Sequence, residues 1–250
     1  MSLSTNKRIA VYISAGFATA PNFLDAFAAE LASRFQQSGW HGQVSIHFPY
    51  GDWSRNALRQ LHEIGKDLWM KRSTASGTDS APVGQPDYGA KSLYTFIRQH
   101  ASPEEPLLLI GHSGGAVASM QAAELLSKEG REVIGVIQIG SPKNWIPAPW
   151  KERVLYIHAE YRRKSTLDPV PWIGSWGGWI RMPSGRWRWS REKHAPVSRQ
   201  GVSILGGHAD YFRDHEPYVE AGMTNMHKTV NAIWAWLDKL ILQIDEPINE

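Results

Sequence analysis

The part of this chain that most constrains its fold is residues 106–118, where an apolar run passes through Gly-x-Ser-x-Gly into a helical pattern. Residues 107–110 are continuously apolar, as in a strand buried on both faces. Gly111 and Gly115 lie two residues either side of Ser113 and allow a sharp turn that exposes the serine. The segment therefore predicts a strand, a tight turn and a helix ending near Gly130, with Ser113 as a nucleophile. The alternative is a glycine-tightened turn in which Ser113 only caps the helix.

Strand patterns alternate with helical patterns along the rest of the chain, which is typical of a parallel sheet covered on both faces. We expect strands at residues 8–14, 43–48, 107–110, 132–139, 153–158 and 202–205. Apolar stripes predict helices at residues 24–35, at about 54–71, leading into residue 100, and at 230–241. The fold class is therefore α/β, with a mostly parallel central sheet.

Length and composition narrow the class of protein. A chain of 250 residues without linkers or internal repeats predicts a single domain over residues 1–250. The absence of cysteine excludes disulfides, thiolate metal sites and a cysteine nucleophile. A net charge of +3 does not favour nucleic acid as a partner. No apolar run approaches the roughly 18 residues of a membrane span, so we expect no stable membrane insertion.

The N-terminal segment imitates a secretory signal, because Lys7 and Arg8 precede an apolar run that ends in Ala-Thr-Ala at residues 18–20. Cleavage there would remove the first strand and the Ala-Gly-Phe turn at residues 15–17. We therefore expect a cytoplasmic protein, with secretion as the alternative.

A nucleophilic serine needs a histidine to accept its proton and a carboxylate to orient that histidine. In the chain order Ser, acid, His, only residues after Ser113 qualify. His208 is the strongest choice, because it follows the last expected strand through Gly206 and Gly207 and precedes the terminal helix. Four other histidines lie after the serine, in polar or helical surroundings or ahead of the expected acid: His158, His194, His215 and His227.

Two acidic residues compete for the third role. Asp168 lies in a loop stiffened by Pro169 and Pro171, which would hold its carboxylate at a fixed angle. Glu160 lies closer to the preceding expected strand and is the alternative. Asp168 could also serve only as a turn residue ahead of proline.

The negative oxygen of a tetrahedral intermediate needs two backbone donors, one from the residue after the nucleophile and one from the loop after the first strand. We expect these to be Gly114 and Phe17. Gly16 would let the second loop approach closely, although it could be a simple turn glycine.

Three segments resemble the lipase class 3 family of the α/β-hydrolases. They are the elbow Gly-His-Ser-Gly-Gly-Ala at residues 111–116, Gly-Ser-Pro at 140–142, and Asp-Pro-Val-Pro at 168–171. His208 followed by Tyr211 is similar to a His-x-x-Tyr near that family's C-terminal end. The resemblance implies an α/β-hydrolase fold and an ester hydrolase with Ser113, Asp168 and His208 as its triad, and it favours Asp168 over Glu160. Residue 114 departs from the family, being glycine in place of the common leucine.

Residues 169–200 form a tryptophan-rich insertion between the expected acid and the expected histidine. Residues 179–182 and 186–189 flank Pro-Ser-Gly and predict a hairpin with indoles on one face and arginines on the other. We expect a cap that binds substrate, or equally a packed aromatic cluster, and membrane docking is a third, weaker interpretation. The residues expected to line the substrate pocket are Trp172, Trp176, Trp179 and Tyr211.

These patterns together predict a serine hydrolase that cleaves a small-molecule or lipid-like carboxylic ester through an acyl-enzyme, without metal or cofactor. Thioesterase, amidase and acyltransferase reactions use the same residues and stay open. A catalytically silent hydrolase fold that binds lipid or protein through its tryptophans is the competing hypothesis. The oligomeric state is left open.

Overall fold

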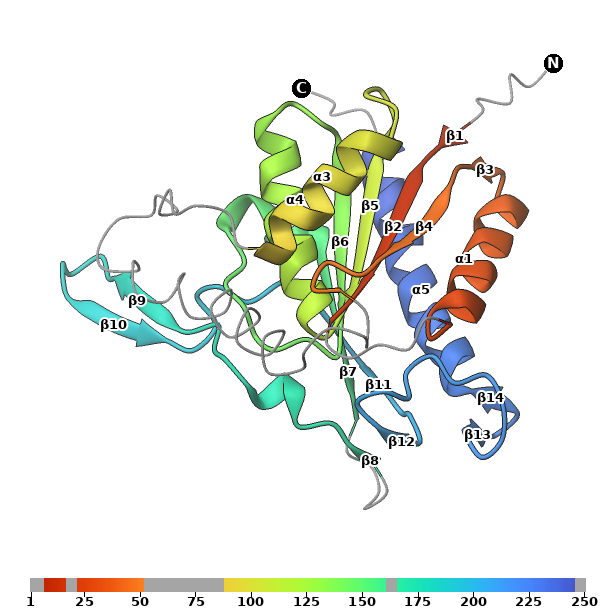
Figure 1. Ribbon diagram of the computed structural model, residues 1–250. Coiled ribbons are helices and arrows are strands. Elements are labelled where there is room, and N and C mark those ends of the chain that lie inside the picture. Colours follow the sequence, from red (N-terminus) through yellow and green to blue (C-terminus); the bar gives the residue numbers. More distant parts are fainter. Residues whose placement is uncertain (1–6, 17–21, 52–87, 161–165, 246–250) are drawn as a thin grey trace.

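The protein is built on a central sheet of six parallel strands in the order β11-β7-β6-β5-β2-β4 (Figure 1). The computed structural model describes residues 7–16, 22–51, 88–160 and 166–245. The predicted α/β class with a mostly parallel sheet is confirmed. The strands of the sheet are β2 (Ala10–Ala15), β4 (Val44–His47), β5 (Leu107–His112), β6 (Val133–Ile139), β7 (Val154–Ala159) and β11 (Ser198–Val202).

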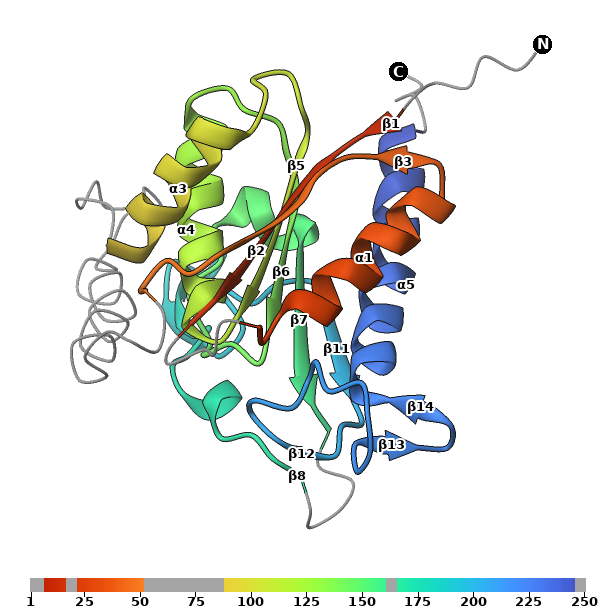
Figure 2. The ribbon, with the colours of Figure 1, turned by 45° about the vertical axis from the view of Figure 1, so that its right-hand side comes forward.

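Helices cover both faces of this sheet, with α1 (Asp25–Gln37) and α5 (Asn225–Asp245) on one side and α3 (Tyr88–His100) and α4 (Gly114–Lys128) on the other (Figure 2). Each face has its own apolar core. Val11 and Ile13 of β2 pack in the core that holds α1 and α5, whereas Ala10 and Tyr12 pack with α3 and α4. Because both faces are buried, the central strands are continuously apolar rather than alternating.

Shorter elements lie outside the sheet. Two 3-10 turns occur, η1 (Ala148–Arg153) and η2 (Val170–Trp172). The remaining strands pair two by two: β1 (Lys7–Arg8) with β3 (Trp40–His41), β8 (Thr166–Leu167) with β12 (Gly206–Gly207), β9 (Gly178–Arg181) with β10 (Trp187–Ser190), and β13 (Val219–Glu220) with β14 (Met223–Thr224).

The direction of winding reverses between β2 and β5. After β2 the chain adds β4 on one side, and after β5 it adds β6, β7 and β11 on the other. In open α/β sheets, ligands bind where this reversal opens a crevice beyond the carboxyl ends of the strands. Gly16 and Ser113 directly follow the ends of β2 and β5, so they lie where this topology predicts a ligand site.

Most of the expected elements are confirmed, including the helix α4, which ends at Lys128, two residues before Gly130, whose φ of +82° suits glycine. The expected last strand at residues 202–205 is wrong, because the strand is β11 at Ser198–Val202. This strand lies at the edge of the sheet and is partly exposed, so it carries polar residues. It therefore lacks the apolar run from which the other strands are predicted. The helix expected at about 54–71 lies outside the described residues.

Candidate active site

Ser113 lies at the turn between β5 and α4 with φ 58° and ψ −130°, in a region of backbone space that non-glycine residues rarely occupy. The flanking glycines make the turn feasible. A Cβ on Gly111 would lie 2.2 Å from Cα of Ala116, and one on Gly115 would lie 2.5 Å from the carbonyl oxygen of Ser14. The predicted strand, turn and helix are therefore confirmed, and the backbone strain is localised at the serine.

The chain leaving β2 lies against the beginning of α4. A Cβ on Gly16 would approach the backbone nitrogen of Gly114 to 2.6 Å, so glycine is required for this contact. Gly114 is the first residue of α4, where N–H groups have no acceptor within the helix and the helix dipole favours negative charge. Phe17, the second expected donor, lies outside the described residues.

The register of two short strands brings the predicted acid and histidine together. In the parallel pair of β8 and β12, Gly206 lies opposite Thr166 and Gly207 opposite Leu167. Asp168 directly follows β8, and His208 directly follows β12. Nδ1 of His208 lies 2.9 Å from Oδ1 of Asp168. Thus the acid and the histidine, 40 residues apart in the chain, form a hydrogen-bonded pair.

Asp168 is fully buried and accepts hydrogen bonds on both carboxylate oxygens. Oδ1 also accepts the N–H of Val170 at 3.0 Å, and Oδ2 accepts the hydroxyl of Tyr211 at 2.7 Å. Burial alone would raise the pKa of Asp168, but His208 and these donors lower it below its ordinary value. Asp168 is therefore ionised at neutral pH. Glu160, the alternative acid, packs against Gly201 of β11.

The loop that carries His208 is fixed by the buried side chain of Asn225 at the start of α5. The Asn225 side-chain amide donates to the carbonyls of Leu205 and Asp210 at 2.7 and 2.8 Å, and its oxygen accepts the Leu205 N–H at 2.9 Å. Within the loop, Oδ2 of Asp210 accepts the N–H of Gly207 at 2.8 Å. These bonds on both sides of His208 restrict its backbone.

Because Nδ1 of His208 donates to Asp168, its Nε2 is the unprotonated nitrogen and can act as a base. This Nε2 is buried and has no hydrogen-bond partner within the described part of the chain. His112 stacks on the His208 ring with centroids 4.7 Å apart, and its Nε2 donates to the His208 carbonyl at 3.0 Å. Since Ser113 follows His112 directly, this contact joins the serine turn to the histidine loop.

Burial lowers the pKa of His112 to about 3, and the nearby His208 adds to the effect. His112 is therefore neutral at physiological pH and adds no positive charge beside His208. Sequence reasoning assigned this residue no role, although it is the histidine of the Gly-His-Ser elbow at residues 111–116. The signal available was a histidine in an otherwise apolar strand end.

The structure corrects the expected substrate pocket at two positions. Tyr211 is fully buried, donates to Asp168 and accepts the N–H of Ala159 at 2.8 Å, so it supports the acid rather than lining an open pocket. Trp176 is only 7% exposed and packs edge-to-face on Tyr156 with centroids 4.8 Å apart. A buried phenol or indole contributes to packing and to hydrogen bonding of its neighbours, and it leaves no surface for a ligand.

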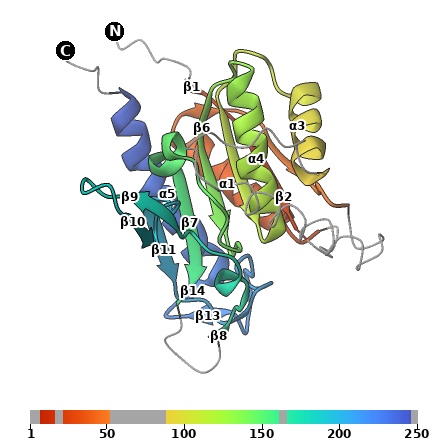
Figure 3. The same ribbon diagram turned by 90° about the vertical axis from the view of Figure 1, so that its left-hand side faces the viewer.

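Trp172 and Trp179, the other two expected pocket residues, are exposed on the outer surface by 61% and 55%. The predicted hairpin is confirmed as β9 and β10, and it projects from the body of the molecule (Figures 1 and 3). The tryptophans of the hairpin are therefore not a packed cluster in the interior. The expected division of its faces is wrong, because Arg181 lies opposite Trp187 and so shares the side of the indoles.

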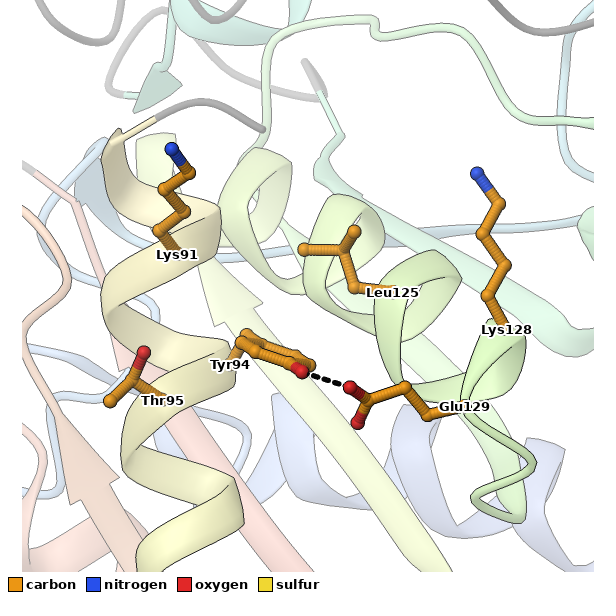
Figure 4. Close-up of a pocket in the computed structure, with 6 residues that line it drawn as sticks. All are labelled: Lys91, Tyr94, Thr95, Leu125, Lys128 and Glu129. Carbon is orange, nitrogen blue, oxygen red and sulfur yellow. Dashed lines mark hydrogen bonds between the residues drawn. The ribbon is translucent and has the colours of Figure 1, made fainter. Parts of the chain in front are cut away.

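A separate groove of about 480 Å³ lies between α3 and α4 (Figure 4). Leu125 and Lys128 of α4, with Glu129 directly after the helix, are at the end of α4 opposite Ser113, about 20 Å away at 1.5 Å per residue. Its full lining is Lys91, Tyr94, Thr95, Leu125, Lys128 and Glu129. Tyr94 hydrogen-bonds to Glu129 across the groove. The groove is thus remote from the serine.

Two further features are absent from the described ranges. No helix there is both long and apolar enough to cross a bilayer. Nor does that part of the chain gather three or more His, Cys, Asp or Glu side chains in a way that could hold a metal ion.

Comparison with known proteins gives matches among solved structures alone. No protein-family model matches the chain, so the resemblance to the lipase class 3 family is not confirmed. No curated protein matches it either. Solved structures similar to this chain include YbtT, a type II thioesterase from the yersiniabactin biosynthetic pathway, and RedJ, a thioesterase from the prodiginine pathway of Streptomyces coelicolor.

The YbtT alignment has 20% sequence identity and a TM-score of 0.34, and it covers 55% of this chain and 44% of YbtT. The chain therefore spans less than half of the length of that enzyme. The RedJ alignment has 10% identity and a TM-score of 0.48, over 96% of this chain and 95% of RedJ. At these identities and TM-scores, the likeness to the two thioesterases assigns no function to this chain.

Proposed function

We propose that this protein is a serine hydrolase that cleaves carboxylic esters through a covalent acyl-enzyme. One observation carries the proposal: a histidine oriented by a buried carboxylate, with Nε2 unpartnered within the described residues, is joined through His112 to a strained serine turn. Nucleophilic catalysis by a serine requires a histidine held in this tautomer to accept the hydroxyl proton.

In the proposed first step, Oγ of Ser113 attacks the carbonyl carbon of the ester while Nε2 of His208 accepts the hydroxyl proton. The carboxylate of Asp168 stabilises the imidazolium that forms. The negative charge on the substrate oxygen is met by the N–H of Gly114 and, we propose, by that of Phe17. Removing one such donor from an oxyanion hole slows catalysis about 100- to 1000-fold.

In the second step the tetrahedral intermediate collapses, and His208 donates its proton to the departing alkoxide, which leaves as an alcohol. The acyl group stays on Ser113. A water molecule then attacks the acyl-enzyme, giving its proton to His208, and the carboxylic acid leaves as the serine recovers its proton. Asp168 and Tyr211 move no proton in this scheme and serve to orient His208.

A fluorophosphonate probe tests the proposal, because it reacts covalently with an activated serine. We expect labelling of the wild-type protein at Ser113, none in Ser113→Ala and little in His208→Ala. The exposed Ser184→Ala variant, at the tip of the β9–β10 turn, should label as the wild type does. A folded wild-type protein that takes no label would contradict the proposal and favour a silent binding module.

Oxygen esters and thioesters share these steps and differ in the leaving group. Parallel p-nitrophenyl ester and acyl-thioester series of increasing chain length would define the acyl group and the leaving group. We expect turnover of the ester series and its loss in Ser113→Ala. Turnover confined to thioesters would replace the ester in the proposal while leaving the residues' roles unchanged.

A further inference from the structure

The β9–β10 hairpin exposes more aromatic surface than a folded protein ordinarily leaves in water. Trp179, Trp187 and Trp189 have exposed fractions of 55%, 57% and 48%. Trp172, on the segment that leads into the hairpin, is 61% exposed. Clusters of exposed large apolar side chains mark sites of contact with proteins, ligands or membranes.

The register of the hairpin gathers these indoles on one face. Trp187 lies opposite Arg181, and Trp189 lies opposite Trp179. Residues opposite each other in an antiparallel pair point to the same side, so three indoles and one guanidinium share that side. The rings of Trp179 and Trp189 pack edge-to-face with centroids 5.5 Å apart and an angle of 80° between them.

The charge of this region is of one sign. Residues 172–191 contain four arginines and no aspartate or glutamate. All four arginines are exposed, and none forms an ion pair with another described residue. They are Arg181, Arg186, Arg188 and Arg191. An anionic partner would therefore not be repelled by negative charge on the hairpin. No carboxylate of the hairpin would compete with that partner for the arginines.

We propose that the β9–β10 hairpin docks the protein on the surface of an anionic lipid bilayer. Indole rings prefer the boundary between acyl chains and headgroups, and guanidinium groups pair with lipid phosphates. The hairpin carries arginines on both faces, since Arg188 lies opposite Ile180 on the side away from the indoles. A projection that is apolar and basic on both sides suits a fluid headgroup layer that surrounds it, whereas a flat protein partner would cover one side.

Single-stranded nucleic acid is the other anion to which tryptophan and arginine are suited. Bases stack on aromatic rings whose flat faces are open. Trp179 and Trp189 are perpendicular to each other, and Gly177 lies under the Trp189 ring, with a Cβ on that glycine 2.5 Å from the ring. This geometry offers no parallel row of indole faces, so the bilayer is favoured.

The docking surface is also connected to the candidate site along the chain. Trp172 closes the 3-10 turn η2 four residues after Asp168, and the exposed Ile173 follows it. A protein docked through this segment and the hairpin would receive its ester from the lipid surface. Delivery of the ester from the lipid surface rests on the proposed function, whereas docking itself does not.

Flotation with extruded vesicles tests the proposal on the full chain. Wild-type protein should bind vesicles of phosphatidylcholine with 30 mol% phosphatidylglycerol and bind far less to phosphatidylcholine alone, with the difference reduced by added salt. The Arg186→Gln/Arg188→Gln double variant should lower the partition coefficient about 30-fold. Trp187→Ser should lower it about tenfold and reduce quenching of tryptophan fluorescence by brominated lipid.

The matched control is Lys91→Gln/Lys128→Gln, which removes two exposed positive charges from the α3–α4 groove of Figure 4 and should leave binding unchanged. Ser113→Ala should still bind vesicles, so that failure of docking and failure of the proposed chemistry are told apart. The proposal is overturned if wild-type protein ignores anionic vesicles, if the control weakens binding equally, or if a single-stranded oligonucleotide binds through the hairpin while vesicles do not.

Discussion

At the scale of single residues, His112 links the serine turn to the histidine loop and does so as a neutral, buried ring. Its pKa of about 3 lies below the ordinary value of 6.5. The unfolded chain therefore binds a proton at this residue between those two pH values and the folded chain does not. Stability contributed by this difference is present above pH 6.5 and is lost as the pH falls toward 3.

We predict that His112 alone lowers the free energy of unfolding by about 2 kcal/mol between pH 7 and pH 5. His47, whose pKa burial lowers to about 4, acts in the same direction. His112→Gln retains a donor for the His208 carbonyl and cannot titrate, so its stability should change less over this range. Urea denaturation at both pH values measures the difference. The exposed His215→Gln should behave as wild type, and an equal pH response in His112→Gln would refute the assignment.

At the scale of elements, the proposed active site depends on the close approach of the loop after β2 to the first turn of α4. Gly16→Ala would place a methyl group 2.6 Å from the Gly114 nitrogen, whose N–H we propose as a donor to the substrate oxygen. We predict that kcat/KM for a soluble ester falls about 100-fold in this variant.

The control for this variant is Gly130→Ala, at a glycine after α4 with a positive φ and open space around it. It should cost about 1 kcal/mol of stability and leave kcat/KM unchanged. Circular dichroism would verify that Gly16→Ala is folded. Wild-type kcat/KM in a folded Gly16→Ala protein would contradict the oxyanion-site assignment.

The elements that could be predicted from the sequence were those with a continuous apolar run or a regular helical spacing of apolar residues. They are the central strands, the elbow and α1, α4 and α5. The edge strand β11 could not be found in this way, because its Ser-Arg-Gln-Gly-Val sequence is polar and its pairing with β7 is set by tertiary contacts. The two-residue pair of β8 and β12 carries no pattern at all, although its register joins Asp168 to His208. Chain order was sufficient to select those two residues but could not reveal how they meet.

At the scale of the whole molecule, one parallel sheet carries the proposed chemistry at its switch point and the proposed lipid-docking hairpin on its periphery (Figure 1). The sequence indicated both segments, but it could not tell whether the tryptophans turn inward or outward. Whether a tryptophan is buried depends on tertiary packing. Trp176 packs against the buried ring of Tyr156, whereas the hairpin indoles remain exposed. In the proposed reaction, Ser113 forms the covalent link with the acyl group.

Rapid-quench mass spectrometry during turnover of p-nitrophenyl butyrate tests for this covalent link. We predict a transient butyryl adduct on the intact protein that maps to the peptide containing Ser113, forms together with a burst of p-nitrophenol, and is absent in Ser113→Ala. An adduct on another residue, or undiminished hydrolysis by Ser113→Ala, would contradict it.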